Sequence, residues 1–185
     1  ATVSAPSVIH ALSLKRGNCL SGPEITCDAG LGADTSRVVF LAEPDSTYYF
    51  IVEVNSFSAN YTFTLEEVPP VQNDLCPGTD ILALPYSDIG NTVFATNQYT
   101  GSCYGGTAGD VVYRYAAADS VLLYAKVTAA WNDALHVRTN NCASGTSLYC
   151  DIGNGADSSW FVFWAEPDSV YYFIVDGTSS GQFGD

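Results

Sequence analysis

The chain has 185 residues, of which 47% are hydrophobic and 13% aromatic, enough for a packed core and unlike the composition of a disordered protein. Six Lys and Arg against twenty Asp and Glu give a net charge of −14, which argues against nucleic-acid binding because that binding uses cationic side chains to meet phosphates. No apolar run reaches about 18 residues, so we expect no membrane-spanning helix.

The predicted elements are short strands, and the first in chain order lies at Leu12-Ser13-Leu14. Apolar and other residues alternate there, as expected when one face of a strand is buried. A hairpin is predicted from Arg37 to Val54, with its turn at Glu43-Pro44-Asp45-Ser46, because Pro at the second turn position pre-sets φ. A closing strand is predicted at Phe63 to Val68.

The second half of the chain continues in the same style, with apolar, β-branched and aromatic runs between turns. A second Glu-Pro-Asp-Ser turn, at 166–169, joins the last two predicted strands. The predicted strands are Val111 to Ala116, Val121 to Val127, Leu135 to Val137, Ser159 to Ala165 and Val170 to Val175. Short strands separated by Gly, Pro, Asn and Asp turns indicate an antiparallel β-sandwich.

A long internal repeat organises these elements. Asn18 to Val52 and Asn141 to Val175 align without a gap at an offset of 123 residues, and 23 of the 35 paired positions are identical. Similarity at a fixed period is typical of tandem modules, and 123 residues is the size of one ordinary domain. We therefore predict an all-β chain of disulfide-stapled, jelly-roll-like β-sandwich modules in tandem.

Extending the offset shows that both modules are partial. Ala1 then corresponds to Tyr124, and Asp185 to Thr62. Residues 1–70 are predicted to be the C-terminal half of one module, and residues 71–185 a second module that lacks its last strand. A half module leaves unpaired strand edges that seek a partner. Either the chain is a window on a longer polypeptide, or subunits complete each other end to end.

The six cysteines occur at repeated positions. Pairing them by position within each module predicts the disulfides Cys19–Cys27, Cys142–Cys150 and Cys76–Cys103. A metal site is the rival explanation, but it needs Cys-x2-Cys spacing or nearby His ligands, and neither occurs. Disulfides place the protein in an oxidising setting, so we expect an extracellular or cell-surface location.

Several scattered motifs resemble the bacterial pre-peptidase C-terminal (PPC) domain. They are Asn73-Asp74-x-Cys76, Ala95-Thr96, Cys103, Asp110 to Tyr115, Leu135-x-Val137, the Cys142/Cys150 pair, Asp151-x-Gly153, and the Ala-Glu-Pro-Asp-Ser-x-Tyr-Tyr-Phe-Ile-Val hairpin. The resemblance covers the second module and the back half of the first. It implies a secreted, non-catalytic, jelly-roll-like module that aids secretion, substrate attachment or assembly. No protease-like segment accompanies it here.

Nothing in the sequence indicates catalysis, and we predict that the chain is not an enzyme. The two histidines, His10 and His136, do not recur between the copies, and we expect both to be solvent-facing strand residues. No Gly-x-Ser-x-Gly elbow and no His-Glu-x-x-His motif occurs.

The loop after each paired Cys is the candidate metal site. It carries Asp28 and Asp34 in the first copy, and Asp151, Asn154 and Asp157 in the second, with glycines between them. Two carboxylates on a Gly-rich loop are the kind of oxygen ligands that Ca²⁺ takes, so calcium is the candidate cofactor. The alternative is a tight turn in which Asp accepts hydrogen bonds from backbone amides.

Two surface features complete the list of candidate sites. Asn60-Tyr61-Thr62 is the only N-glycosylation triplet, which makes Asn60 the candidate glycan site. Alternation along one strand puts Trp160 and Trp164 on the opposite face from Phe161 and Phe163. The two tryptophans either belong to the core or form an exposed pair that contacts sugars or a neighbouring module.

Three functions follow from these features. The first, which we favour, is a structural repeat of an extracellular fibre or surface array, with copies of itself or neighbouring modules as partners. The second is an accessory module of a secreted hydrolase that binds polysaccharide or protein. The third is a calcium-dependent adhesin.

Overall fold

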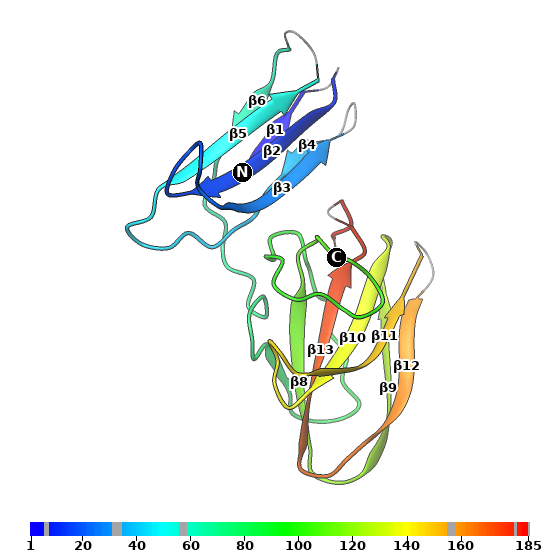
Figure 1. The fold of residues 1–185 in the computed structure, drawn as a ribbon. Helices are drawn as coiled ribbons and strands as arrows, with labels where there is room; N and C mark the ends of the chain where they lie inside the picture. Colours follow the sequence, from blue (N-terminus) through cyan, green and yellow to red (C-terminus); the bar gives the residue numbers. More distant parts are fainter. Residues whose placement is uncertain (6–7, 31–34, 56–58, 155–157, 180, 185) are drawn as a thin grey trace. The chain divides into compact units, whose positions relative to one another are not determined.

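The computed structural model describes the whole chain except residues 6–7, 31–34, 56–58, 155–157, 180 and 185. Every regular element among the described residues is a β-strand, which confirms the all-β prediction (Figure 1). No helix in this part of the chain is long and apolar enough to cross a membrane. The chain divides into two compact units, Ala1–Val68 and Pro69–Asp185, at a point close to the predicted boundary.

Unit 1 contains two three-stranded sheets, ordered β4-β1-β6 and β3-β2-β5. All of their pairings are antiparallel. The strands are β1 (Thr2–Ser4), β2 (His10–Arg16), β3 (Glu24–Gly30), β4 (Thr35–Arg37), β5 (Tyr48–Val54) and β6 (Thr62–Thr64). Val3, Leu12 and Val38 form the buried core, with Phe50 and Val52 packed against it.

Unit 2 contains a five-stranded sheet, ordered β11-β10-β13-β8-β7, and a two-stranded sheet, β12-β9. Only the β7–β8 pairing is parallel among those described. The strands are β7 (Thr79–Ile81), β8 (Val111–Ala117), β9 (Val121–Thr128), β10 (Asp133–Thr139), β11 (Thr146–Ile152), β12 (Ser158–Ala165) and β13 (Ser169–Gly177). One apolar cluster joins the two sheets, and Leu123, Val137, Phe161 and Phe173 belong to it.

The two Glu-Pro-Asp-Ser turns have the same backbone shape. Asp45 has φ of 59° and Asp168 has φ of 58°, both in the left-handed region that Asp tolerates better than most residues. The turn prediction is therefore confirmed in both copies.

The predicted Arg37–Val54 hairpin is shorter than expected, because β4 ends at Arg37. In unit 2 the equivalent strand β12 continues to Ala165, since β9 pairs with it along its whole length. In unit 1 the pairing stops at Ala1, whose backbone exchanges two hydrogen bonds with Val38. The apolar run that follows Val38 therefore has no described strand beside it.

The pairing registers also correct the alignment at the start of the chain. Val3 lies opposite Ser36 in unit 1, and Val127 lies opposite Ser159 in unit 2. Ser36 and Ser159 are equivalent at the offset of 123, so Val3 is equivalent to Val127 rather than to Lys126. Unit 1 thus has one more residue between its first two strands than unit 2 has between β9 and β10. Ala1 corresponds to Ala125, not to Tyr124.

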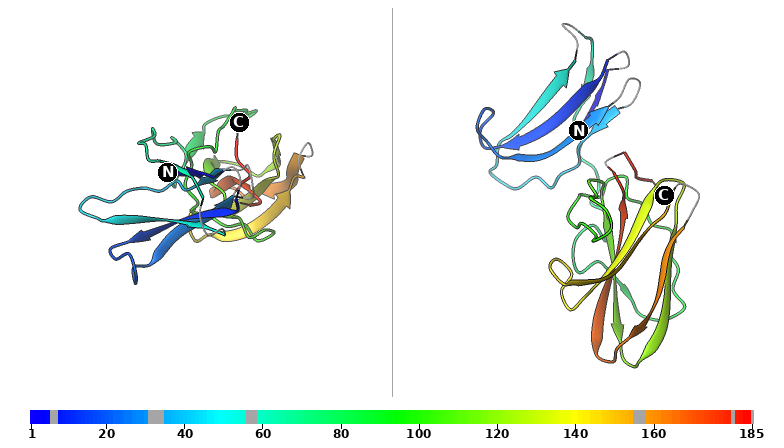
Figure 2. Two further views of the ribbon diagram at one scale, coloured as in Figure 1. Left: turned by 90° about the horizontal axis from the view of Figure 1, so that it is seen from above. Right: turned by 45° about the vertical axis from the view of Figure 1, so that its right-hand side comes forward.

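In unit 2, the segment before β8 covers the second face of the five-stranded sheet (Figures 1 and 2). Its Tyr99 packs in a small buried cluster with Val112 and Ile174. Its Tyr104 donates a hydrogen bond of 2.8 Å to Asp176 of β13 and lies edge-on to the ring of His136 on β10. The sheet therefore has buried residues on both faces.

Candidate docking surfaces

The disulfides link different cysteines from those predicted. Cys76 is bonded to Cys142, and Cys103 to Cys150, with Cα–Cα distances of 5.9 and 5.7 Å. The predicted Cys142–Cys150 and Cys76–Cys103 pairs are wrong. The reason lies in β11, because the four steps from Thr146 to Cys150 alone extend about 13 Å, twice the Cα separation that a disulfide spans.

The third predicted bridge is absent as well, and Cys19 and Cys27 are free and exposed in unit 1. They stand at the positions of Cys142 and Cys150. In unit 2, Cys142 and Cys150 are bonded to Cys76 and Cys103, and both of these partners lie in the segment before β9. Unit 1 contains no counterpart of that segment. The two disulfides of unit 2 are of the kind that forms in oxidising compartments.

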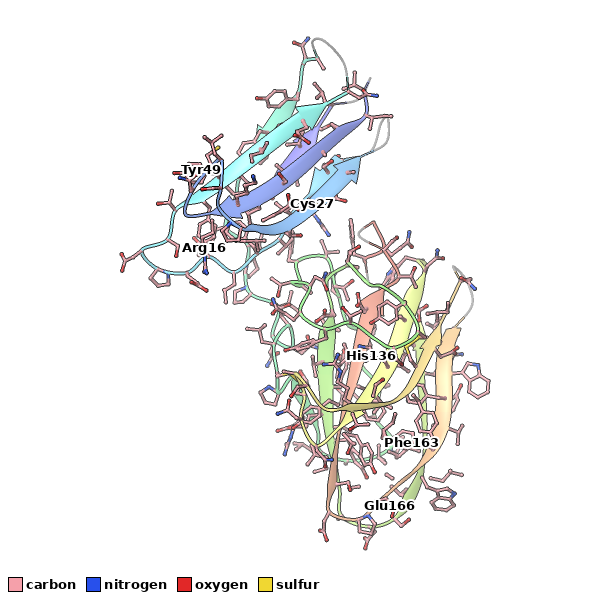
Figure 3. All side chains as sticks on the ribbon, in the orientation of Figure 1. Arg16, Cys27, Tyr49, His136, Phe163 and Glu166 are labelled. Atoms are coloured by element: carbon pink, nitrogen blue, oxygen red, sulfur yellow. A yellow bond between two sulfur atoms is a disulfide. The ribbon has the colours of Figure 1, made fainter. Side chains whose placement is uncertain are left out.

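The prediction of solvent-facing histidines is also wrong. His10 is 1% exposed and His136 is fully buried. His10 and its counterpart Asp133 have equivalent partners: Ser36 donates its backbone N–H to His10 Nε2, and the Ser159 hydroxyl donates to the Asp133 carboxylate. His136 has no hydrogen-bond partner on either ring nitrogen within the described structure, and it lies in the interior of unit 2 (Figure 3).

Two carboxyl groups of unit 2, those of Asp110 and Asp176, are buried as well. Asp110 accepts hydrogen bonds from the backbone amides of Gln98 and Tyr99, yet burial raises its pKa to about 8. Burial raises the pKa of Asp176 to about 7. Burial also lowers the pKa of His136 to about 4, with a smaller contribution from the charge of Arg138. Through their hydrogen bonds to Gln98, Tyr99 and Tyr104, these two carboxyl groups hold the segment before β8 on the sheet.

The candidate calcium ligands are only partly within the described residues, because Asp34 and Asp157 lie outside them. The Asp28 carboxylate accepts hydrogen bonds of 2.7 Å from the Arg37 amide and 2.9 Å from the Ala29 amide. Asp151 accepts one of 2.8 Å from the Trp160 amide. Both aspartates therefore bind backbone amides, as the alternative interpretation predicts.

In the part of the chain that the structure describes, no group of three or more His, Cys, Asp or Glu side chains is placed to hold a metal ion. Asn154 is exposed at the end of β11. The candidate glycan site, Asn60, is exposed just before β6.

Trp160 and Trp164 lie on an exposed apolar face of the β9–β12 sheet. They are 53% and 63% exposed, whereas Phe161 and Phe163 on the opposite face are buried. The alternation predicted for this strand is thus present, and the structure excludes a core role for the two tryptophans. The other exposed apolar residues of this face are Leu122, Tyr124 and Val162. Rows of aromatic and aliphatic side chains of this kind mark contact surfaces.

A groove of about 410 Å³ runs along the second edge of β9. Its lining includes residues 123–129 and 86–90, and Phe173 of β13. Within the described residues, β9 pairs on one edge only, with β12. The groove therefore borders a row of backbone groups that no described strand pairs.

Unit 1 shows what occupies the equivalent place. There β6 pairs with the second edge of β1, and Val3 lies opposite Phe63. The Phe63 ring packs on Phe50, with ring centroids 5.4 Å apart. Phe173 is the counterpart of Phe50, so the groove of unit 2 lies where unit 1 has β6. The repeat predicted that residues 71–185 do not include a strand equivalent to β6, but it did not predict a groove at that place.

The comparisons with known proteins identify no relative. No family model, no curated protein and no solved structure matches the chain. We therefore infer its function from the open strand edges, the exposed aromatic face and the cysteines described above.

Proposed function

We propose that this chain is a non-catalytic structural repeat of an extracellular fibre or surface array, in which modules dock serially by strand complementation. Each unit is then a jelly-roll-like β-sandwich module of the kind that resembles the PPC domain. The internal repeat, the two disulfides and the acidic composition support this function. A net charge of −14 keeps such modules from associating except through specific surfaces.

The groove along β9 is the observation that carries the proposal. By the equivalence of Val3 and Val127, a β6-like strand in the groove would place its Phe opposite Val127 and its flanking Thr residues opposite Lys126 and Thr128. All three of these β9 residues line the groove. The Phe ring would lie against Phe173, as Phe63 lies against Phe50.

Strand addition of this type combines two sources of binding energy. The incoming backbone forms hydrogen bonds along the open edge, and alternate side chains enter pockets that set the register. Burial of one Phe side chain contributes about 2 kcal/mol. We therefore infer that the occupant is a strand with the sequence character of Thr62-Phe63-Thr64.

The test is titration of the protein with a synthetic peptide of residues 59–68, followed by isothermal calorimetry. We expect one peptide to bind per chain. The matched control is the same peptide with Phe63→Ala, which keeps the backbone but should bind at least about tenfold more weakly. Equal affinity of both peptides, or no binding together with dispersed single particles in electron microscopy of the native material, would contradict the proposal.

A second function, an accessory carbohydrate-binding module of a secreted hydrolase, rests on the exposed aromatic face. Trp160 and Trp164 stand four residues apart on the same side of β12, and Tyr124 lies beside Trp160 with ring centroids 6.1 Å apart. Flat aromatic rings can stack on sugar rings. Retention of the protein on an insoluble polysaccharide, lost in a Trp160→Ala/Trp164→Ala variant, would select this function.

A further inference from the structure

We propose that unit 1 is the acceptor for a segment of the same type as residues 71–117, locked by two disulfides to Cys19 and Cys27. The inference rests on the proposed serial docking of modules. The β9 groove of unit 2 is one docking site, and this inference identifies the partner at a second site, on unit 1. Four observations in the two units support it.

The first observation is the placement of the cysteines. Cys19 and Cys27 occupy the positions of Cys142 and Cys150, which bind Cys76 and Cys103 of the 71–117 segment. Both thiols of unit 1 are exposed, so they are accessible to a partner. The expected links are therefore Cys19 to a Cys76-type residue and Cys27 to a Cys103-type residue.

The second observation is the strand edge beside them. In unit 2, β8 pairs with the edge of β13 that faces away from β10, and Ile174 lies opposite Val112. In unit 1, β5 pairs with β2 and has no other partner in the described part of the chain. A β8-type strand on this edge would place its second Val opposite Ile51, the counterpart of Ile174.

The third observation is half of an apolar cluster. In unit 2, Ile174 is fully buried beside Tyr99 and Val112, and Tyr172 packs against them. Unit 1 keeps the acceptor residues at identical positions as Ile51 and Tyr49, but both are only half-buried. Tyr49 lies on β5, and Cys27 lies on β3 of the same sheet (Figure 3).

The fourth observation is a supporting contact that both units make. Arg138 donates to the backbone carbonyl of Ala143 and also reaches the carbonyl of Thr100 in the 71–117 segment. In unit 1, Lys15 donates to the carbonyl of Leu20, the counterpart of Ala143. The loop that presents the first cysteine is therefore held in the same way, and a cation is already in place beside it.

Each bridge forms by oxidation of two thiols. The two S–H groups lose two protons and two electrons, and an S–S bond forms between them. Glutathione disulfide is the oxidant: its own S–S bond breaks, and it takes up both electrons and both protons to give two thiols.

The test mixes the 185-residue protein with an isotopically labelled fragment of residues 71–117 in a glutathione redox buffer. Mass spectrometry under non-reducing conditions then identifies the adduct and its links. We expect a one-to-one adduct with Cys19 bonded to labelled Cys76 and Cys27 bonded to labelled Cys103. The unlabelled Cys76–Cys142 and Cys103–Cys150 bridges should stay intact, which shows that unit 2 is undisturbed.

An Ile51→Ser variant is the matched control, because Ile51 is half-buried and its loss should not unfold unit 1. It should lower the yield of the adduct about tenfold by removing the apolar contact while leaving both thiols. A Cys19–Cys27 bridge, an equal mixture of all four links, or the same yield from Ile51→Ser would overturn the inference.

The outcome is separable from that of the proposed function. The peptide of residues 59–68 binds the β9 groove, which contains no cysteine, so its binding does not depend on Cys19 or Cys27. Peptide binding without the specific adduct would overturn this inference alone. Failure of both would overturn serial docking as well.

Discussion

The Tyr104 hydroxyl donates a hydrogen bond of 2.8 Å to the Asp176 carboxylate, joining the segment before β8 to the far face of β13. Only one oxygen of that carboxylate has a partner, and the other is buried without one. Asp110 has the same arrangement, with one satisfied and one unsatisfied oxygen. We therefore expect these two carboxyl groups to make the stability of unit 2 depend on pH.

We expect the free energy of unfolding of unit 2 to fall as pH rises from about 6.5 to 8. A carboxyl whose pKa is raised on folding stabilises the fold when protonated, and that stabilisation is lost as pH rises toward the folded pKa, about 8 for Asp110 and about 7 for Asp176. The loss should be about 2 kcal/mol over this window. Below pH 6.5, the lowered pKa of His136 acts in the opposite direction and masks part of the trend.

Chemical denaturation at a series of pH values measures this dependence. The Asp176→Asn variant keeps an acceptor for Tyr104 but cannot ionise, so its stability should vary less with pH. A wild-type protein equally stable at pH 6.5 and pH 8 would contradict the prediction.

Loss of the Cys76–Cys142 bridge should destabilise unit 2 strongly. The bridge closes a loop with a sequence separation of 66 residues. In the chain-entropy model this is worth about 4 kcal/mol, so a Cys76→Ala/Cys142→Ala variant should unfold at much lower denaturant concentration. Non-reducing peptide mapping checks the pairing itself, and recovery of a Cys142–Cys150 peptide would restore the prediction from sequence.

Two neighbouring aromatic residues of β12 should respond oppositely to truncation. Phe163 is 4% exposed within the core, so Phe163→Ala should cost about 3–5 kcal/mol of stability. Trp164 is 63% exposed, so Trp164→Ala should change stability by no more than about 0.5 kcal/mol. Thermal unfolding of both variants measures the contrast. A large loss in Trp164→Ala would show that this face is covered within the folded chain.

The aspartates that follow Cys27 and Cys150 should act through backbone amides. Asp151→Ala removes the acceptor for the Trp160 amide and should cost about 1 kcal/mol, whereas Asp151→Asn should cost less because it keeps a carbonyl oxygen. On this basis millimolar Ca²⁺ should not move the melting temperature. A rise with Ca²⁺ in the wild-type protein, absent from Asp151→Asn, would instead establish the calcium site.

The repeat allowed most strands to be predicted, because alternation and the Glu-Pro-Asp-Ser turns are local properties of the sequence. It also led to the wrong disulfides. Cys142 and Cys150 are close in sequence and recur as a pair, but the extended backbone of β11 separates them. Which distant cysteine meets each one depends on how the 71–117 segment crosses the sheet, and no local pattern encodes that path.

The burial of the histidines and the exposure of the tryptophans could not be predicted from the sequence, for the same reason. His136 is buried because Tyr104, from a segment 32 positions earlier in the sequence, covers its face of the sheet. Trp164 is exposed because no described strand or loop covers the outer face of β12. Burial on a strand is set by what lies over each face, and alternation shows only that the two faces differ.

The Cys76–Cys142 bridge also sets how unit 2 bears mechanical load. A pull applied at Pro69 and Asp185 passes from Cys76 directly to Cys142 through the sulfur atoms, so the 66-residue separation between them cannot be drawn out. At about 3.5 Å per residue, the bridge withholds about 230 Å of extension. A fibre built from such units would extend little under load, and reducing agents would make it more extensible.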